Sequence, residues 1–207
     1  LFQPKIPHVE IEKRIPIGSG LGGGSSDAAR FIATVFDIWQ IPLEKRLESI
    51  KFFKSLGSDA IVFLYRYFLG ADTLCLDGTG FEEGSVFPLS ISGLNDLYVI
   101  VVHDGICLST KMVYDNFAGP LQPTLDMGNC ALEFLEDFHN SLQDSAISLV
   151  PEIRDILNSI EETGPRFCGV SGAGSSCFGL YDSRSMAEKA GKSLSTYGYD
   201  FVRISRI

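Results

Sequence analysis

The sequence predicts an α+β fold. Apolar residues recur at helical spacing in several segments, and short apolar runs of strand length lie between glycine turns. The two kinds of segment are mixed without the regular βαβ alternation of a parallel sheet. Because 45% of the 207 residues are hydrophobic and 21% are charged, we expect a packed core in one large domain or two small ones.

The first predicted elements are a strand and a helix joined by a run of glycines. Residues 9–17 alternate apolar and charged side chains, which is the pattern of a strand. Residues 16–29 then read PIGSGLGGGSSDAA, in which five of fourteen residues are glycine. Apolar side chains at helical spacing, among them Ala29 and Ala33, predict a helix over residues 26–41.

The rest of the first half is predicted to be helical and then β. A second helix is expected over residues 43–56, with a glycine after its end. Residues 58–68 are an apolar stretch that fits either a strand or a helix, and residues 70–89 read as short β segments with glycine turns. We place the domain boundary after this part, with an N-terminal lobe over residues 1–92 and a C-terminal lobe over residues 93–207.

The second half begins and ends with strands. Strands are predicted over residues 98–105 and 199–207, and a strand, a glycine turn and a second strand over residues 166–182. Helices are predicted over residues 108–117, 130–143, 151–162 and 183–197.

Charge, hydropathy and cysteine content exclude several classes of protein. The net charge is −9 and no basic cluster is longer than Lys13-Arg14, so no nucleic-acid partner is expected. No apolar run approaches the ~18 residues that span a bilayer, and the start lacks a secretory leader pattern. The five cysteines are odd in number and widely spaced, which argues against a disulfide framework. We therefore expect a cytoplasmic protein with no membrane partner.

The glycine segment is typical of an anion-binding loop. Glycine allows the backbone to approach a ligand closely, and the first N–H groups of a helix lack partners within the helix. The P-loop pattern is absent because no lysine follows the glycines. The dinucleotide pattern G-x-G-x-x-G is met by Gly18, Gly20 and Gly23, but the second strand that it requires is not predicted. A glycine turn capped by serine, without a ligand, is a further alternative.

PIGSGLGGGSSDAA resembles the second signature motif of the GHMP kinases, a family of small-molecule kinases. The resemblance implies a two-lobed fold with an N-terminal lobe like domain 2 of ribosomal protein S5 and a ferredoxin-like C-terminal lobe. It also implies that this motif binds ATP through Pro16, Gly18, Gly20, Leu21, Gly22, Gly23, Gly24, Ser25 and Ser26. Either Ser25 or Ser26 is expected to bind Mg²⁺.

The glycine turn within residues 166–181 resembles the third motif of the same family, which lies near the triphosphate. The residues implied are Ser171, Gly172, Ala173, Gly174 and Ser175. A tight hairpin turn without a ligand is one alternative. A hydrolase elbow, G-x-S-x-G, is another, but Ala173 stands in place of its final glycine.

LGSDAIVFL, residues 56–64, resembles the family stretch that carries the catalytic aspartate. Asp59 is therefore expected to be catalytic, half-buried and close to phosphate. Phosphoryl transfer needs such a carboxylate to orient or deprotonate the acceptor hydroxyl. Ile61 departs from the family pattern, because relatives usually carry proline there. Without the resemblance, Asp59 also fits the cap of a following helix.

CLSTKMVYDNF, residues 107–117, resembles the turn that holds cytosine in one branch of the family. Thr110 and Tyr114 are therefore candidate substrate residues, with the Tyr114 ring stacking on the base. An ordinary half-buried helical tyrosine is the alternative. Asn140, in FHNSLQDSA, matches a family position that we expect to be structural.

The resemblance implies transfer of the γ-phosphoryl group of ATP to the 2-hydroxyl of 4-diphosphocytidyl-2-C-methyl-D-erythritol, in the non-mevalonate route to isoprenoid precursors. The resemblance also implies Mg·ATP as the phosphoryl donor, a small acceptor that contains cytidine diphosphate, and a monomer or weak homodimer. Another GHMP kinase or a related decarboxylase is an alternative, although their motifs are usually shorter. An inactive nucleotide-binding fragment is another, because the family's first motif, with a lysine and an asparagine, finds no match here. We therefore expect an incomplete N-terminal lobe.

Overall fold

The computed structural model describes residues 8–70, 74–76, 86–88, 93–119 and 140–207. The chain packs as two compact units, each of which combines two stretches of sequence. The first unit contains residues Leu1–Arg14 and Gly22–Ser90, and the second contains Ile15–Leu21 and Ile91–Ile207. The chain therefore passes from the second unit into the first within the glycine segment, between Leu21 and Gly22.

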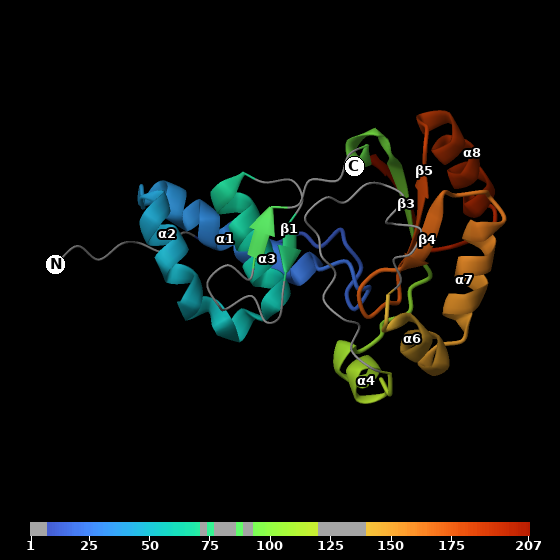
Figure 1. Ribbon diagram of the computed structural model, residues 1–207, viewed down its shortest axis with the longest axis horizontal. Coiled ribbons are helices and arrows are strands. Elements are labelled where there is room, and N and C mark those ends of the chain that lie inside the picture. The colour runs from blue at the N-terminus through green and yellow to red at the C-terminus, as the bar shows by residue number, and fades with distance from the viewer. Residues whose placement is uncertain (1–7, 71–73, 77–85, 89–92, 120–139) are drawn as a thin grey trace. The chain divides into compact units, whose positions relative to one another are not determined.

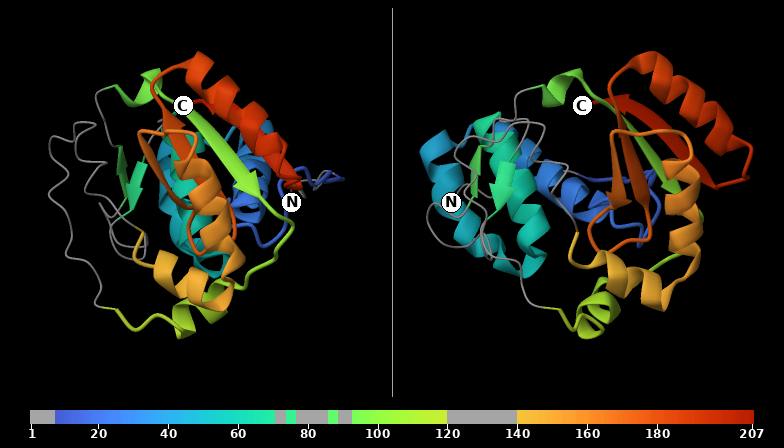
Figure 2. Two further views of the ribbon diagram at one scale, coloured as in Figure 1. Left: turned by 90° about the vertical axis from the view of Figure 1, so that its right-hand side faces the viewer. Right: turned by 45° about the vertical axis from the view of Figure 1, so that its right-hand side comes forward.

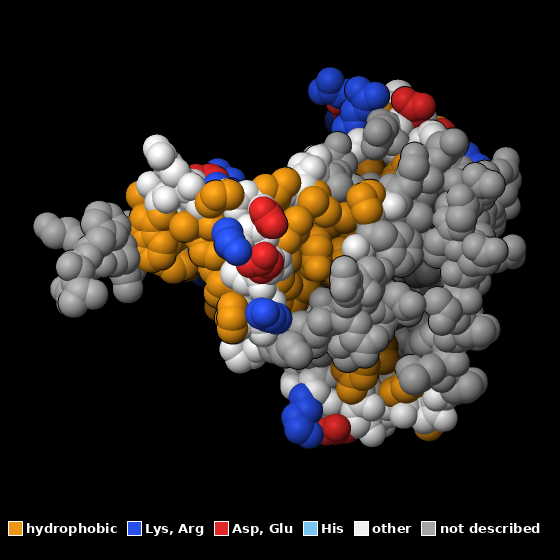
Figure 3. All heavy atoms as spheres, turned by 60° about the vertical axis from the view of Figure 1, so that its left-hand side comes forward, with side chains coloured by type: hydrophobic (Ala, Val, Ile, Leu, Met, Phe, Trp, Pro, Cys, Tyr) orange, Lys and Arg blue, Asp and Glu red, His pale blue; other side chains and the backbone are white. Residues whose placement is uncertain are grey.

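The first unit is mainly helical (Figure 1). Its elements are α1 (Gly23–Ile38), α2 (Leu43–Ser49), a 3₁₀ helix (Ile50–Leu56), α3 (Ser58–Leu69) and the antiparallel strands β1 (Leu74–Leu76) and β2 (Val86–Pro88). The core lies between α1 and α3, where the buried side chains of Ala29 and Ala33 belong to the same cluster as Ile61 and Leu64. Figure 3 shows hydrophobic side chains on the surface of this unit as well.

The apolar stretch 58–68, which fitted either a strand or a helix, is helix α3. Ile61, Leu64 and Phe68 are buried and recur at three- and four-residue spacing, so they form one face of the helix. Gly57 precedes the helix, and Gly70 ends it with a left-handed φ of 68°.

Two predictions for the first half are wrong. Residues 8–17 form no strand, because no described segment supplies the hydrogen bonds that a strand needs; Val9 and Ile11 are exposed instead. The predicted helix 43–56 is divided, since α2 ends at Ser49 and the 3₁₀ helix that follows is interrupted at Phe53, with φ −98° and ψ 15°.

The second unit is an antiparallel sheet with the strand order β4-β5-β3-β6. Its strands are β3 (Tyr98–His103), β4 (Phe167–Val170), β5 (Cys177–Tyr181) and β6 (Phe201–Arg206). Its helices are a 3₁₀ turn (Leu94–Asp96), α4 (Thr110–Asp115), α6 (Gln143–Leu149), α7 (Glu152–Glu161) and α8 (Arg184–Ser195). Figure 2 shows α7 and α8 on one face of the sheet. This βαββαβ order confirms the ferredoxin-like prediction.

The core of the second unit lies between the sheet and these two helices. Ile100 and Val102 of β3 project toward buried apolar side chains of α7 and α8, including Ile160 and Leu194. The predicted helices 151–162 and 183–197 and the strands of this half are thus confirmed. The predicted helix 130–143 lies mostly outside the described residues.

Candidate functional site

The first half of the glycine segment is tied to the second unit through its carbonyl groups. The carbonyl oxygens of Gly18, Ser19 and Gly20 accept hydrogen bonds from Leu108 N, Ser176 N and Ser171 Oγ at 3.1, 2.9 and 3.0 Å. In a planar trans peptide, the N–H of the next residue points away from the carbonyl. The N–H groups of Ser19, Gly20 and Leu21 therefore point away from these partners, and none has a hydrogen bond among the described residues.

The backbone of this segment alternates in handedness. Gly18, Gly20 and Gly22 have φ of 68°, 75° and 64°, whereas the intervening residues keep negative φ. Successive N–H groups in such an alternating backbone converge into a concave anion site. A Cβ on Gly20 would lie 2.6 Å from the carbonyl oxygen of Gly174, so both the dihedral and the close approach require glycine here.

The predicted third-motif turn is the partner of this segment. It joins β4 to β5 and closes with hydrogen bonds from Ser171 N to Ser176 O and from Gly174 N to Ser171 O, both at 2.9 Å. Ala173, Gly174 and Ser175 are buried, whereas Gly172 is exposed. The structure thus brings third-motif residues together with Gly20 of the glycine segment.

Asn140 holds the other side of the turn. Its Nδ2 donates to the carbonyl oxygens of Val170 and Gly172 at 2.9 and 2.6 Å, and its Oδ1 accepts from Leu142 N at 3.0 Å. Gln143 adds a further contact, because its Oε1 accepts from Val170 N at 3.0 Å. These hydrogen bonds give a physical reason for the structural role that we expected for Asn140.

A buried histidine beside the turn did not emerge from the sequence reasoning. His103, at the end of β3, is 2% exposed, and its Nδ1 lies 3.3 Å from Ser175 Oγ and 3.4 Å from Ser176 Oγ. Burial lowers the pKa of His103, while the carboxylates of Asp200 and Asp104 act in the opposite direction. The sequence feature that could have pointed to His103 is its position as a polar residue directly after the apolar run YVIVV.

In the first unit, the start of α1 offers unpaired backbone donors. Gly22 caps the helix without a side-chain hydrogen bond, and the first bond within the helix runs from Ser26 N to Gly22 O at 2.9 Å. Among the described residues, no partner is found for the N–H groups of Gly23, Gly24 and Ser25 or for the hydroxyls of Ser25 and Ser26. These donors carry the partial positive charge of the helix end.

Asp59 lies in the first turn of α3, in the same unit. It caps nothing, its side chain is exposed rather than half-buried as expected, and its carboxylate has no partner among the described residues. Phe63, one helical turn further on, is the nearest side chain to Gly22: a Cβ there would lie 3.1 Å from the ring. Because residues four apart share a helix face, Asp59 lies on the same side of α3 as Phe63.

Thr110 and Tyr114 lie on α4, away from the turn contacts. Both are exposed, and Tyr114 keeps 59% of its surface accessible, more than an ordinary half-buried tyrosine would. Ser145 of α6 fixes this helix, since its Oγ donates to Val113 O at 2.8 Å. Asn116 Nδ2 donates in turn to Ser145 Oγ at 3.2 Å.

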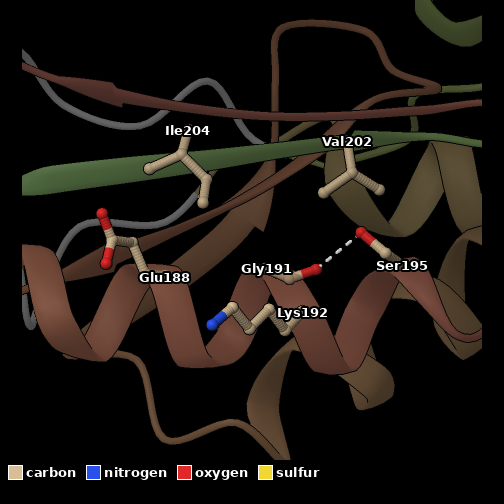
Figure 4. Close-up of a pocket in the computed structure, with 6 residues that line it drawn as sticks. All are labelled: Glu188, Gly191, Lys192, Ser195, Val202 and Ile204. Atoms are coloured by element: carbon tan, nitrogen blue, oxygen red, sulfur yellow. Dashed lines mark hydrogen bonds between the residues drawn. The ribbon is translucent and has the colours of Figure 1, made fainter.

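A groove between α8 and β6 contains none of the predicted site residues (Figure 4). Its lining residues are Glu188, Gly191, Lys192, Ser195, Val202 and Ile204. Ser195 Oγ donates to Gly191 O at 2.7 Å, and a Cβ on Gly191 would lie 2.6 Å from the Ile204 side chain. This groove therefore reflects close helix–strand packing.

Within the described part of the chain, no cluster of histidine, cysteine and acidic side chains is arranged to hold a metal ion. The helices described there are also too short or too polar to cross a membrane.

Comparison with known proteins defines the class. The family profile for the GHMP kinases N terminal domain matches residues 2–66, and the profile for the GHMP kinases C terminal region matches residues 126–200. The chain belongs to the GHMP kinase family.

Two curated relatives carry the same name. The chain is 33% identical over 192 residues to 4-diphosphocytidyl-2-C-methyl-D-erythritol kinase of Brucella melitensis, covering 90% of this chain and 62% of that protein. It is 32% identical over 187 residues to the enzyme of the same name from Wolbachia pipientis, covering 88% and 61%. The chain thus spans less than two thirds of the length of these relatives.

Solved structures confirm the α+β GHMP kinase fold. A crystal structure of 4-(cytidine 5'-diphospho)-2C-methyl-D-erythritol kinase matches with a TM-score of 0.68 and 29% identity, covering 94% of this chain and 67% of that one. Homoserine kinase from Cytophaga hutchinsonii matches with a TM-score of 0.60, covering 94% and 68%. Its 16% identity supports the shared fold alone.

Proposed function

We propose that the protein transfers the γ-phosphoryl group of ATP to the 2-hydroxyl of 4-diphosphocytidyl-2-C-methyl-D-erythritol. The observation that carries the proposal is the set of backbone N–H groups in the glycine segment that have no partner among the described residues, within a chain about 30% identical to kinases of that name. The same proposal includes a role in isoprenoid precursor synthesis, a cytoplasmic location and a monomeric or weakly dimeric state. It includes no nucleic-acid or membrane partner.

The glycine segment binds the phosphates of ATP in this proposal. The N–H groups of Ser19, Gly20 and Leu21 point away from the partners that hold the carbonyls of this segment, and those of Gly23 and Gly24 open helix α1. Backbone donors of this kind bind phosphate without requiring a lysine, and a helix N-terminus favours negative charge. They also supply a local attraction that the net charge of −9 does not.

The first turn of α1 suits Mg²⁺ bound together with ATP. The hydroxyls of Ser25 and Ser26 have no hydrogen-bond partner among the described residues, and hard oxygen donors are the ligands that Mg²⁺ prefers. When bound, Mg²⁺ neutralises charge on the phosphates. Either serine would hold it directly or through water.

Asp59 is the proposed base or orienting group. Its carboxylate is exposed, has no partner among the described residues, and lies on the same side of α3 as Phe63, whose ring is next to Gly22. In the reaction, the acceptor oxygen forms a bond to the γ-phosphorus, the bond to ADP breaks, and the hydroxyl proton passes to Asp59.

The remaining site residues have supporting roles in the proposal. Ser171, Gly172, Ala173, Gly174 and Ser175 form the turn that fixes the glycine segment near the triphosphate. Tyr114 has an accessible ring that stacks on the cytosine of the acceptor, and Thr110 lies at the start of the same helix.

Calorimetry with Mg·ATP, paired with a turnover assay on a panel of acceptor alcohols, tests the function. We expect ATP binding and turnover of the cytidine-diphosphate acceptor but not of homoserine. Turnover of another alcohol would support a different GHMP kinase, a possibility that the shared fold with homoserine kinase keeps open. Binding without turnover of any acceptor would support a non-catalytic nucleotide-binding protein.

A further inference from the structure

We infer that His103 is a positioning residue for the glycine segment and acts through the turn of residues 171–176. The inference rests on the proposed function, because it concerns the backbone that would bind phosphate. His103 is buried at the end of β3, and its Nδ1 reaches the hydroxyls of both Ser175 and Ser176.

The backbone of these serines leads directly to the glycine segment. Ser176 N–H donates to Ser19 O at 2.9 Å, and Ser175 Oγ donates to Ile106 O. Each serine therefore makes a further hydrogen bond besides its contact with His103. The carbonyl of Ser19 and the N–H of Gly20 belong to one planar peptide. A shift of Ser176 therefore rotates the Gly20 N–H, which is one of the proposed phosphate donors.

The chemistry of the imidazole suits this role. A neutral ring has one N–H donor and one nitrogen acceptor, so its Nδ1 can pair with buried hydroxyls without bringing a charge into the core. Burial favours this neutral form against the carboxylates of Asp200 and Asp104. An apolar side chain at this position would remove the His103 contact of the buried Ser176 hydroxyl and leave Ser175 Oγ with Ile106 O alone, and the turn would move to regain hydrogen bonds.

The test compares His103→Asn with His103→Ala by calorimetry with Mg·ATP and by steady-state kinetics. Asparagine places an amide near the position of Nδ1, whereas alanine removes the contact. We expect His103→Ala to weaken ATP binding about tenfold and to raise KM for ATP more than it lowers kcat. We expect His103→Asn to bind ATP within about threefold of the unaltered protein.

Two further variants separate positioning from general loss of stability. Leu194→Ala removes a fully buried side chain from α8, a helix that makes no hydrogen bond with the turn among the described residues, and should lower Tm without changing the Kd for ATP. Ser176→Ala keeps the N–H that holds Ser19 but loses a hydroxyl, so it should weaken ATP binding even if the His103 variants fail to fold.

Backbone NMR without nucleotide gives an independent readout. The amide signals of Ser19, Gly20 and Leu21 should shift in His103→Ala and return toward their positions in His103→Asn. Unchanged amide signals and unchanged ATP binding in His103→Ala, or equal weakening by Leu194→Ala, would overturn the inference. If the unaltered protein binds no ATP, the proposed function fails, and the amide signals alone decide the role of His103.

Discussion

At the scale of single residues, the glycine segment shows why side-chain size and dihedral angle matter together. Gly20 has a φ of 75° and lies against the carbonyl oxygens of Ser171 and Gly174. Gly198 has a similar φ of 83°, but no atom of the described residues lies within 4 Å of a Cβ there. The two positions therefore separate backbone strain from close contact.

Gly20→Ala should abolish measurable ATP binding, because the added methyl group collides with backbone that cannot move without opening the turn. Gly198→Ala is the matched control. It should cost about 1 kcal/mol of stability from its left-handed dihedral and leave the Kd for ATP unchanged. Calorimetry and urea unfolding measure both effects, and normal ATP binding by Gly20→Ala would contradict the proposed phosphate site.

Asp59→Asn should lower kcat by orders of magnitude and leave the Kd for ATP nearly unchanged. The carboxylate is exposed and makes no hydrogen bond or ion pair among the described residues, so the fold should not depend on its charge. Asp155→Asn, on the exposed side of α7, is the control and should leave both constants unchanged. Turnover that survives Asp59→Asn would remove Asp59 from the mechanism.

At the scale of elements, α1 and α3 form the frame of the first unit. Small side chains on α1, Ala29 and Ala33, allow the apolar face of α3 to pack closely against it. At 3.6 residues per turn, Asp59 lies on the side of α3 away from this apolar face, and its side chain is exposed. The spacing of Ile61, Leu64 and Phe68 therefore stabilises the unit and leaves the carboxylate accessible.

Leu64→Ala should lower the free energy of unfolding of the first unit by about 2–5 kcal/mol, since its side chain is fully buried and would leave a cavity. Leu69→Ala, on the same helix but 42% exposed, should cost far less. Urea unfolding followed by circular dichroism measures the difference. Equal losses from the two variants would show that the α1–α3 core is not packed as described.

At the scale of the whole molecule, two opposing electrostatic effects accompany acidification. The net charge of −9 shrinks as the pH falls toward the sequence pI of 4.8, which relieves repulsion between surface carboxylates. Protonation of His103 acts the other way. Its pKa in the folded protein is lowered by burial, so the unfolded chain binds the proton first.

The contribution of His103 to stability is therefore present above its ordinary pKa of 6.5 and is lost as the pH falls below that value. We expect Tm to decrease more steeply between pH 7 and 5 in the unaltered protein than in His103→Asn, which has no ring to protonate. Calorimetric scans of both proteins at matched ionic strength measure the difference. Parallel pH profiles would show that His103 is not the group that titrates.

The sequence alone determined the α+β class through local periodicity. It also determined the family, and with it the ferredoxin-like second lobe, through the resemblance of its glycine motifs, because periodicity and motifs both depend on consecutive residues. It did not predict that residues 8–17 would lack a strand, since pairing depends on a partner elsewhere in the chain. The structure alone decided that α3 is a helix and that Asp59 is exposed. It also revealed His103 beside Ser175, a contact across 72 residues. Such contacts form only when segments that are distant in the sequence pack together, so a local sequence pattern cannot predict them.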